Sequence, residues 1–186
     1  ENYFCDVQVL VTLVSSDPDI MPDALACLAA SAALAVSDVP IKEVISEVRV
    51  ARVEGNFIVN PSRAELAKAD MDFMIGATDK NLMMVEGESN ECSEEELVKA
   101  LEIAHDAIRI QIKAQHELRE KAGVTGKREY AVPEENAELL QKVTDFAKDK
   151  IYQISRSAHN KNERSEGYDK LKEALIESLG EEAEDD

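Results

Sequence analysis

The feature of this sequence that most constrains its fold is a change in the spacing of apolar residues near residue 92. Before that point, short apolar runs alternate with turn residues. After it, apolar residues recur every three or four positions among Glu, Lys and Ala. Short runs bounded by turns predict strands, whereas a 3.6-residue period predicts helices. The sequence therefore predicts an α+β domain followed by an all-helical region.

Strand-like runs begin near the N-terminus. Residues 5–14 start with alternation and become continuously apolar, as a strand does when it enters a covered sheet. The runs 44–53 and 56–59 flank Glu54-Gly55, which predicts a hairpin. We therefore expect at least three strands before residue 60.

A second hairpin is predicted for 71–77 and 82–86, around the turn at 78–81. Both of its halves are apolar, so we expect this hairpin in the middle of the sheet. Before it, Asn60-Pro61-Ser62 opens a short amphipathic turn that runs through Leu66.

Two helices are predicted to pack with these strands. Pro22 suits a helix start, and residues 24–36 are rich in small residues all round, so we expect a buried helix. Ser93 and Glu96 form the pattern of a capping box at the start of a long helix that ends near Gly123. Its apolar stripe is Leu97, Leu101, Ala104, Ile108, Ile112 and Gln115.

Two further helices follow. Pro133, Glu134 and Glu135 are typical of a helix start, and a last helix is expected at about 163–179. The acidic tail 181–186 is expected to fray. The stripe of the first of these helices is Leu139, Val143, Phe146, Ala147, Ile151, Ile154 and Ala158, and that of the second is Tyr168, Leu171, Leu175 and Leu179.

Composition excludes several classes of protein. The 186 residues hold 21 basic and 39 acidic side chains, a net charge of -18, which disfavours a broad face for polyphosphate but leaves room for a local basic cleft. Aromatics are 4% and Trp is absent, so stacking platforms for bases are scarce. Three scattered cysteines are typical of reduced thiols in the cytoplasm. The longest apolar run, 25–36, is too short to span a membrane.

The N-terminus lacks the basic region and apolar core of a signal peptide. Because the chain begins with Glu1 rather than Met, we expect it to be a segment of a longer protein.

The search for a metal or nucleophile site finds little. His105, His116 and His159 show no metal-ligand spacing, and one packed and one solvated histidine on the long helix is the favoured interpretation. Cys27 lies in the Ala-rich helix with no histidine at a nucleophile spacing, so we expect a buried and inert thiol.

Charged residues near the strands offer the remaining candidates. Asp70 and Asp72 share one face of a strand and could hold magnesium, although solvated charge at a strand entry is the favoured interpretation. Arg49 and Arg52 could contact phosphate or RNA, but a cross-strand ion pair is favoured. The run 76–79 lacks a glycine-rich phosphate cradle, which argues against nucleotide binding there. Glu86, Glu88 and Glu91 are interpreted as a solvated loop.

Several stretches resemble the polynucleotide phosphorylase family, whose cores have the RNase PH fold. They are Val7-Gln8-Val9, Pro22-Asp23, Ala30-Ser31-Ala32-Ala33-Leu34, Ile45-Ser46-Glu47-Val48-Arg49-Val50, Asn60-Pro61-Ser62, Gly76-Ala77-Thr78 and Leu82-Met83-Met84-Val85-Glu86-Gly87-Glu88. The resemblance implies that residues 1–122 are the later part of a first RNase PH-like core, a mixed sheet packed with helices. It implies that residues 123–186 begin an all-α linker domain.

The resemblance also implies a function. This family degrades RNA from the 3′ end with inorganic phosphate and Mg²⁺, releases nucleoside diphosphates, and works as a homotrimer around an RNA channel. Its phosphate-binding and metal-binding residues lie in a second core, so the resemblance assigns no catalytic, metal or RNA-binding residue to this chain. It implies RNA as a partner only through the full-length protein, contact with RNA-degradation machinery, a cytoplasmic location and no membrane.

Two function classes follow. The first is an inactive scaffold portion of a phosphorolytic exoribonuclease. The second is a non-enzymatic acidic interaction domain that shares the fold. A free-standing RNase PH-type exonuclease is a weaker third, because it would need its active site around Asp70 and Asp72.

Overall fold

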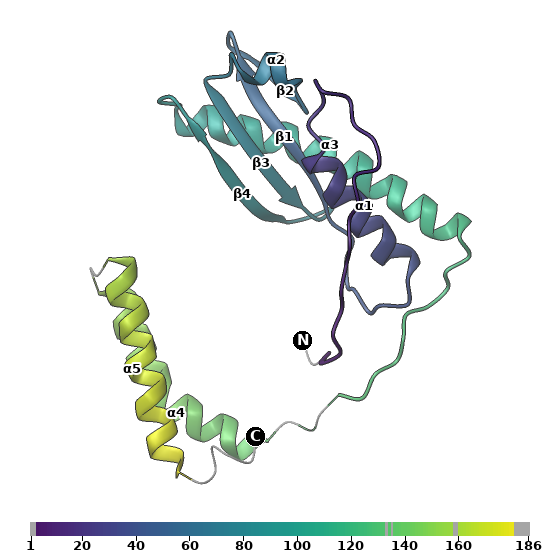
Figure 1. The fold of residues 1–186 in the computed structure, drawn as a ribbon. Helices are drawn as coiled ribbons and strands as arrows, with labels where there is room; N and C mark the ends of the chain where they lie inside the picture. Colours follow the sequence, from purple (N-terminus) through teal and green to yellow (C-terminus); the bar gives the residue numbers. More distant parts are fainter. Residues whose placement is uncertain (1–2, 133, 135, 158–159, 181–186) are drawn as a thin grey trace. The chain divides into compact units, whose positions relative to one another are not determined.

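The structure, a computed structural model, describes residues 3–132, 134, 136–157 and 160–180. These residues form two compact units, which meet in the sequence after Tyr130. Figure 1 shows the elements in chain order. They are α1 (Asp23–Val36), β1 (Ser46–Val53), β2 (Asn56–Val59), α2 (Arg63–Leu66), β3 (Met71–Ala77), β4 (Leu82–Ser89), α3 (Glu94–Lys121), α4 (Ala137–Arg156) and α5 (Lys161–Leu179).

The first unit holds a four-stranded sheet in the order β2-β1-β3-β4. The predicted hairpins are confirmed, since β1 pairs with β2 and β3 pairs with β4. The turn of the first hairpin places Glu54 and Gly55 at φ 49° and 79°, a left-handed pair that glycine makes easier. The resemblance implied a mixed sheet, whereas every pairing among the described strands is antiparallel.

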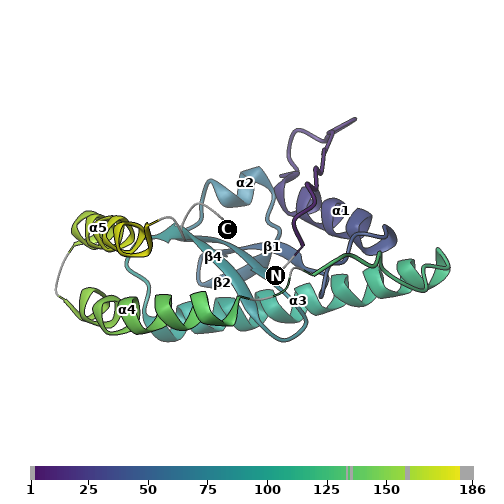
Figure 2. The same ribbon diagram turned by 90° about the horizontal axis from the view of Figure 1, so that it is seen from below.

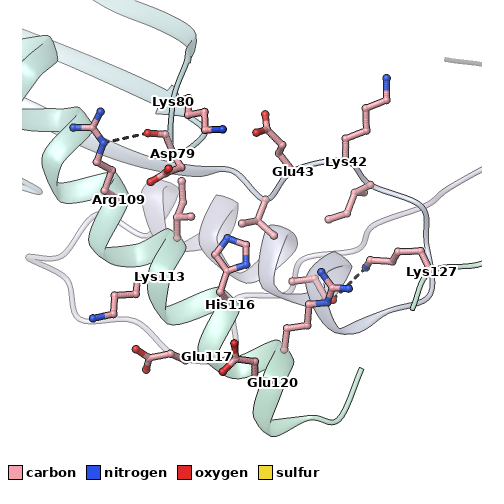
Figure 3. Close-up of a pocket in the computed structure, with 15 residues that line it drawn as sticks. Lys42, Glu43, Asp79, Lys80, Arg109, Lys113, His116, Glu117, Glu120 and Lys127 are labelled. Atoms are coloured by element: carbon pink, nitrogen blue, oxygen red, sulfur yellow. Dashed lines mark hydrogen bonds between the residues drawn. The ribbon is translucent and has the colours of Figure 1, made fainter. Parts of the chain in front are cut away.

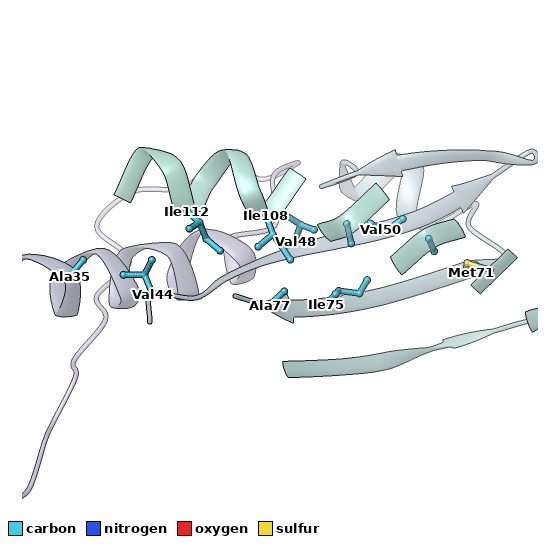
Figure 4. Packing of buried hydrophobic residues seen from close by; sticks show 11 residues of the cluster. Ala35, Val44, Val48, Val50, Met71, Ile75, Ala77, Ile108 and Ile112 are labelled. Atoms are coloured by element: carbon cyan, nitrogen blue, oxygen red, sulfur yellow. The ribbon is translucent and has the colours of Figure 1, made fainter. Parts of the chain in front are cut away.

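Helix α3 lies across one face of this sheet (Figure 2). Its predicted capping box is formed: Ser93 Oγ accepts from the Glu96 amide at 3.2 Å, and a Glu96 carboxylate oxygen accepts from the Ser93 amide at 2.9 Å. The stripe is confirmed too, because Ala104, Ile108 and Ile112 are buried against the sheet. Figure 4 shows Ile108 and Ile112 facing Val48, Val44 and Ala35, so one core joins α3 to the sheet and to α1.

Helix α1 was expected to be buried, but the structure buries only one side of it. Only Ala24, Ser31 and Ala35 are buried, while Leu25 is 56% exposed. The helix packs on α3 and β1 from one side, and among the described residues no element covers the other side. An Ala-rich sequence permits close packing on every face but does not supply the neighbours.

The strand expected at 5–14 is not formed. The residues run without regular structure and are exposed; Val14, for example, is 92% exposed. A strand needs a neighbour for its backbone hydrogen bonds, and the described sheet is made by β1 to β4 alone. The strand-like pattern is therefore present without a partner.

The central place expected for the second hairpin is correct only for β3. Strand β4 lies at the edge of the sheet, and all eight of its residues are exposed, including Met83 at 66%. The strand also continues to Ser89, so Glu86 and Glu88 belong to it and not to a loop. Their side chains are solvated, as expected, and Glu91 follows in a left-handed turn.

The second unit contains the helical hairpin of α4 and α5. Ala147 is buried in it, and Leu139, Val143, Phe146, Ile154, Leu171, Leu175 and Leu179 are partly buried, which confirms most of both stripes. Ile151 and Tyr168 are exposed instead. The α4 cap is Asn136, which accepts from the Leu139 amide. The predictions for Pro133, Glu135, Ala158 and the tail 181–186 lie outside the described residues.

Candidate functional site

The two arginines of β1 organise the charged residues on the sheet. The Arg49 guanidinium donates to both Asp72 carboxylate oxygens, at 2.7 and 2.6 Å, and to an Asp23 oxygen at 2.7 Å. Burial alone would raise the pKa of Asp23, but the hydrogen bonds from Arg49 and the Ala24 amide hold it below its ordinary value. Arg49 thus joins β1 to β3 and to the first turn of α1.

Arg52 forms a second cluster, three residues further along β1. It donates to the two Asp70 carboxylate oxygens at 2.7 and 3.1 Å, and it forms an ion pair with Glu96 of α3. Its side chain is only 10% exposed. The hydrogen bond from Arg52 lowers the pKa of Asp70. This cluster ties the start of β3 to the first turn of α3.

These contacts argue against a Mg²⁺ site at Asp70 and Asp72. They also favour the ion-pair interpretation of the two arginines over contact with phosphate or RNA. A Mg²⁺ ion bound by Asp70 and Asp72 would compete with guanidinium groups that already occupy the same oxygens. The two carboxylates therefore do not fit a magnesium site. In the described ranges, no group of three or more His, Cys, Asp or Glu side chains could hold a metal ion. The cross-strand ion pairs favoured for Arg49 and Arg52 are confirmed.

The histidines and cysteines have ordinary surroundings. His105 is half-buried, and its Nε2 lies 3.0 Å from the Thr78 carbonyl oxygen. His116 is exposed. One packed and one solvated histidine is the arrangement predicted, and His159 lies outside the described residues. Cys27 is half-buried rather than fully buried; burial, with a smaller effect of Glu47, raises the pKa of its thiol to about 11. Such a thiol is protonated and unreactive at neutral pH.

The run 76–79 joins the end of β3 to its turn. Thr78 Oγ1 accepts from the Asn81 and Lys80 amides, at 3.0 and 3.3 Å. The amides of this turn therefore serve the turn itself, and they do not form a cradle for phosphate.

One cavity lies beside α3 and was not predicted from the sequence. It measures about 700 Å³ and lies between the loop 41–44, the β3–β4 turn and the C-terminal half of α3. Figure 3 shows His116 pointing from α3 toward the segment that carries Glu43, with Lys80 approaching from the turn. Its lining comes from segments up to 92 residues apart, such as Ala35 and Lys127. The only signal in the sequence was that a local basic cleft remained compatible with the charge.

One family model matches part of this chain. The profile of the 3′ exoribonuclease family, domain 2, matches residues 43–107, which include β1 to β4 and the first half of α3. The crystal structure of rice (Oryza sativa) Rrp46 overlaps with 59% of this chain and 49% of its own, at 17% identity and a TM-score of 0.44.

Curated relatives extend the match to nearly the whole chain. Polyribonucleotide nucleotidyltransferases from Christiangramia forsetii and Bacteroides fragilis are 46% and 50% identical to it, each over 98% of the chain. The one from Porphyromonas gingivalis is 48% identical over 99%. The chain spans 24%, 26% and 25% of the lengths of these three proteins.

The α+β unit is thus an RNase PH-like domain of the 3′ exoribonuclease type. The chain as a whole belongs to the polyribonucleotide nucleotidyltransferase family, another name for polynucleotide phosphorylases, and covers about a quarter of the length of its relatives. The resemblance drawn from the sequence is confirmed.

Proposed function

We propose that this chain is a scaffold portion of a polyribonucleotide nucleotidyltransferase that degrades RNA from the 3′ end by phosphorolysis. The observation that carries the proposal is the 46–50% identity to enzymes of that name over 98% of the chain. Inorganic phosphate is the attacking group in such a reaction, so the products are nucleoside diphosphates. The full-length protein would use Mg²⁺ in the cytoplasm, as a homotrimer that acts with RNA-degradation machinery.

We assign this chain a supporting role within that enzyme. The carboxylates that could serve chemistry, Asp70 and Asp72, are held by arginines, and the Cys27 thiol is kept protonated. In this proposal, residues 1–122 are the later part of the first RNase PH-like core and residues 123–186 begin the helical linker domain. None of the described helices is long and apolar enough to cross a bilayer.

The test uses the full-length protein that contains this chain. It is incubated with 3′-labelled poly(A) and Mg²⁺, with and without inorganic phosphate, and the products are separated. We expect ADP that appears only with phosphate. AMP formed without phosphate would indicate hydrolysis and contradict phosphorolysis.

The second candidate is a non-enzymatic acidic interaction domain. The net charge of -18 favours it, because such a surface repels RNA phosphates. Absence of any nuclease activity from the full-length protein would support this candidate.

A further inference from the structure

The cavity beside α3 has a charge unlike that of the rest of the chain. Six lysines and arginines and four carboxylates are among its 15 lining residues. The remainder of the chain then holds 15 basic and 35 acidic residues. The basic residues of the cavity are Lys42, Lys80, Arg109, Lys113, Arg119 and Lys127. A locally basic hollow in a strongly acidic protein favours an anionic occupant.

Two of these cationic side chains form hydrogen bonds that hold the fold together. Lys127 Nζ donates to the carbonyl oxygens of Leu34, Ala35 and Ser37, at 2.8, 3.2 and 2.8 Å, and so caps the C-terminus of α1. Arg109 donates to the Asp79 carbonyl oxygen and to Asp106. These contacts hold the walls of the cavity together.

Arg119 forms no comparable hydrogen bonds within the described part of the chain. It is half-buried and lines the cavity, yet its guanidinium forms no ion pair or hydrogen bond with any residue in the described part of the chain. Its charge acts on Lys127: burial first, and then Arg119, lower the pKa of that lysine. Asp38 offsets part of this effect on Lys127, and a bound anion beside Arg119 would offset more of it. An arginine is well suited to bind phosphate with two parallel hydrogen bonds.

The remaining lining sets the size and character of the ligand. Ala35 and Ile112 are almost fully buried, Val44 is 7% exposed, and Ile41 packs against the same core. They give the cavity an apolar floor next to its cationic rim. A volume of about 700 Å³ lies within the range of small-molecule sites. Apolar surface beside free cations matches a compound with both a ring and a phosphate.

We propose that this cavity binds an organic phosphate of nucleotide size, with the phosphate on Arg119, the ring on the apolar floor, and Lys80 adding to the positive charge of the rim. The site does not depend on the proposed function, because all its residues lie between Ala35 and Lys127 of this chain.

The test is a calorimetric titration of the 186-residue chain with ADP, and separately with inorganic pyrophosphate, at low ionic strength. We expect saturable ADP binding that weakens about tenfold in Arg119→Gln, the loss typical of one charge-assisted hydrogen bond. Lys80→Gln, from a different element, should weaken it in the same direction. Pyrophosphate should bind more weakly than ADP, because it has no ring to cover the floor.

The matched control is Lys99→Gln, an exposed lysine of α3 that does not line the cavity. It should leave ADP affinity within about twofold, and circular dichroism should show that all variants are folded. No saturable binding at millimolar ADP would overturn the proposal. Equal losses in Arg119→Gln and Lys99→Gln would overturn it too, because they would indicate general charge attraction. Pyrophosphate that binds as tightly as ADP would overturn the role of the apolar floor.

Discussion

At the scale of single residues, Arg52 is a side chain that joins the sheet to α3. It lies in β1, binds Asp70 before β3, and pairs with Glu96 in the first turn of α3. Glu96 also completes the capping box with Ser93. One guanidinium therefore connects two strands to the beginning of the helix that covers them.

Replacing Arg52 with Met tests this role. Because both acidic partners would lose their counter-charge and the packed arginine stem would be replaced, we expect the free energy of unfolding to fall. Urea denaturation followed by circular dichroism measures it. The matched control is Arg63→Met, since Arg63 is exposed and its side chain forms no ion pair among the described residues. Equal effects of the two substitutions would show that Arg52 has no special role.

The same contacts predict a dependence of stability on pH. Arg52 lowers the pKa of Asp70, and the hydrogen bonds from the Ser93 amide and hydroxyl lower that of Glu96. A carboxylate whose pKa is lowered by folding stabilises the protein above its unfolded pKa, about 4, and loses that effect as pH falls through the folded value. We expect the melting temperature to be steady from pH 7 to about 5 and to fall below about pH 4.

The Arg52→Met variant supplies the control for this prediction. Without the guanidinium, the pKa of Asp70 returns toward its ordinary value, so the decline in melting temperature at acid pH should become shallower. An identical acid limb in the wild type and the variant would show that other carboxylates cause it.

At the scale of elements, the hairpin of β3 and β4 depends on a glycine. Gly87 pairs with Phe73, and a Cβ added there would lie 2.1 Å from the Asp72 carbonyl oxygen and 2.7 Å from Phe73 Cα. Both are backbone atoms of β3, which cannot turn away as a side chain can. Close pairing at this point therefore requires the absence of a side chain.

The substitution Gly87→Ala should separate the strands locally. We expect a loss of about 2–3 kcal/mol in the free energy of unfolding and faster hydrogen exchange at the β4 amides that pair with β3. Gly126→Ala is the control, because a Cβ at Gly126 meets nothing within 4 Å. Unchanged exchange in β4 would mean that the hairpin tolerates a side chain at this position.

Elements with their own boundary signals could be predicted from the sequence. The capping box at Ser93, the turn at Glu54-Gly55 and the stripe through Ile108 and Ile112 all form as expected. Local hydrogen bonds and periodicity fix them. Features that depend on neighbours could not be predicted: residues 5–14 lack a partner strand, and β4 lies at an edge despite an apolar sequence.

In the candidate site, too, some features could be predicted from the sequence and others could not. Ion pairs for Arg49 and Arg52 follow from charges at nearby positions on adjacent strands, so the sequence indicated them. The cavity beside α3 depends on tertiary packing that brings Ala35, Lys80 and Arg119 to one place. No local pattern contains that information.

At the scale of the whole molecule, we propose that this chain supports a phosphorolytic enzyme whose active site lies outside the chain. The match covers 98% of the chain but only 24–26% of the related enzymes. Arg49, Arg52, Asp70 and Asp72 are committed to ion pairs within the fold. We therefore expect the isolated chain to show no phosphorolytic activity.

The most direct measurement compares the 186-residue chain with the full-length protein that contains it, in one assay of phosphate-dependent ADP release from labelled poly(A) with Mg²⁺. We predict ADP release by the full-length protein and none by the chain at the same molar concentration. ADP release by the chain alone would show that an active site lies within it. In that case Asp70→Asn and Asp72→Asn would be the first variants to examine.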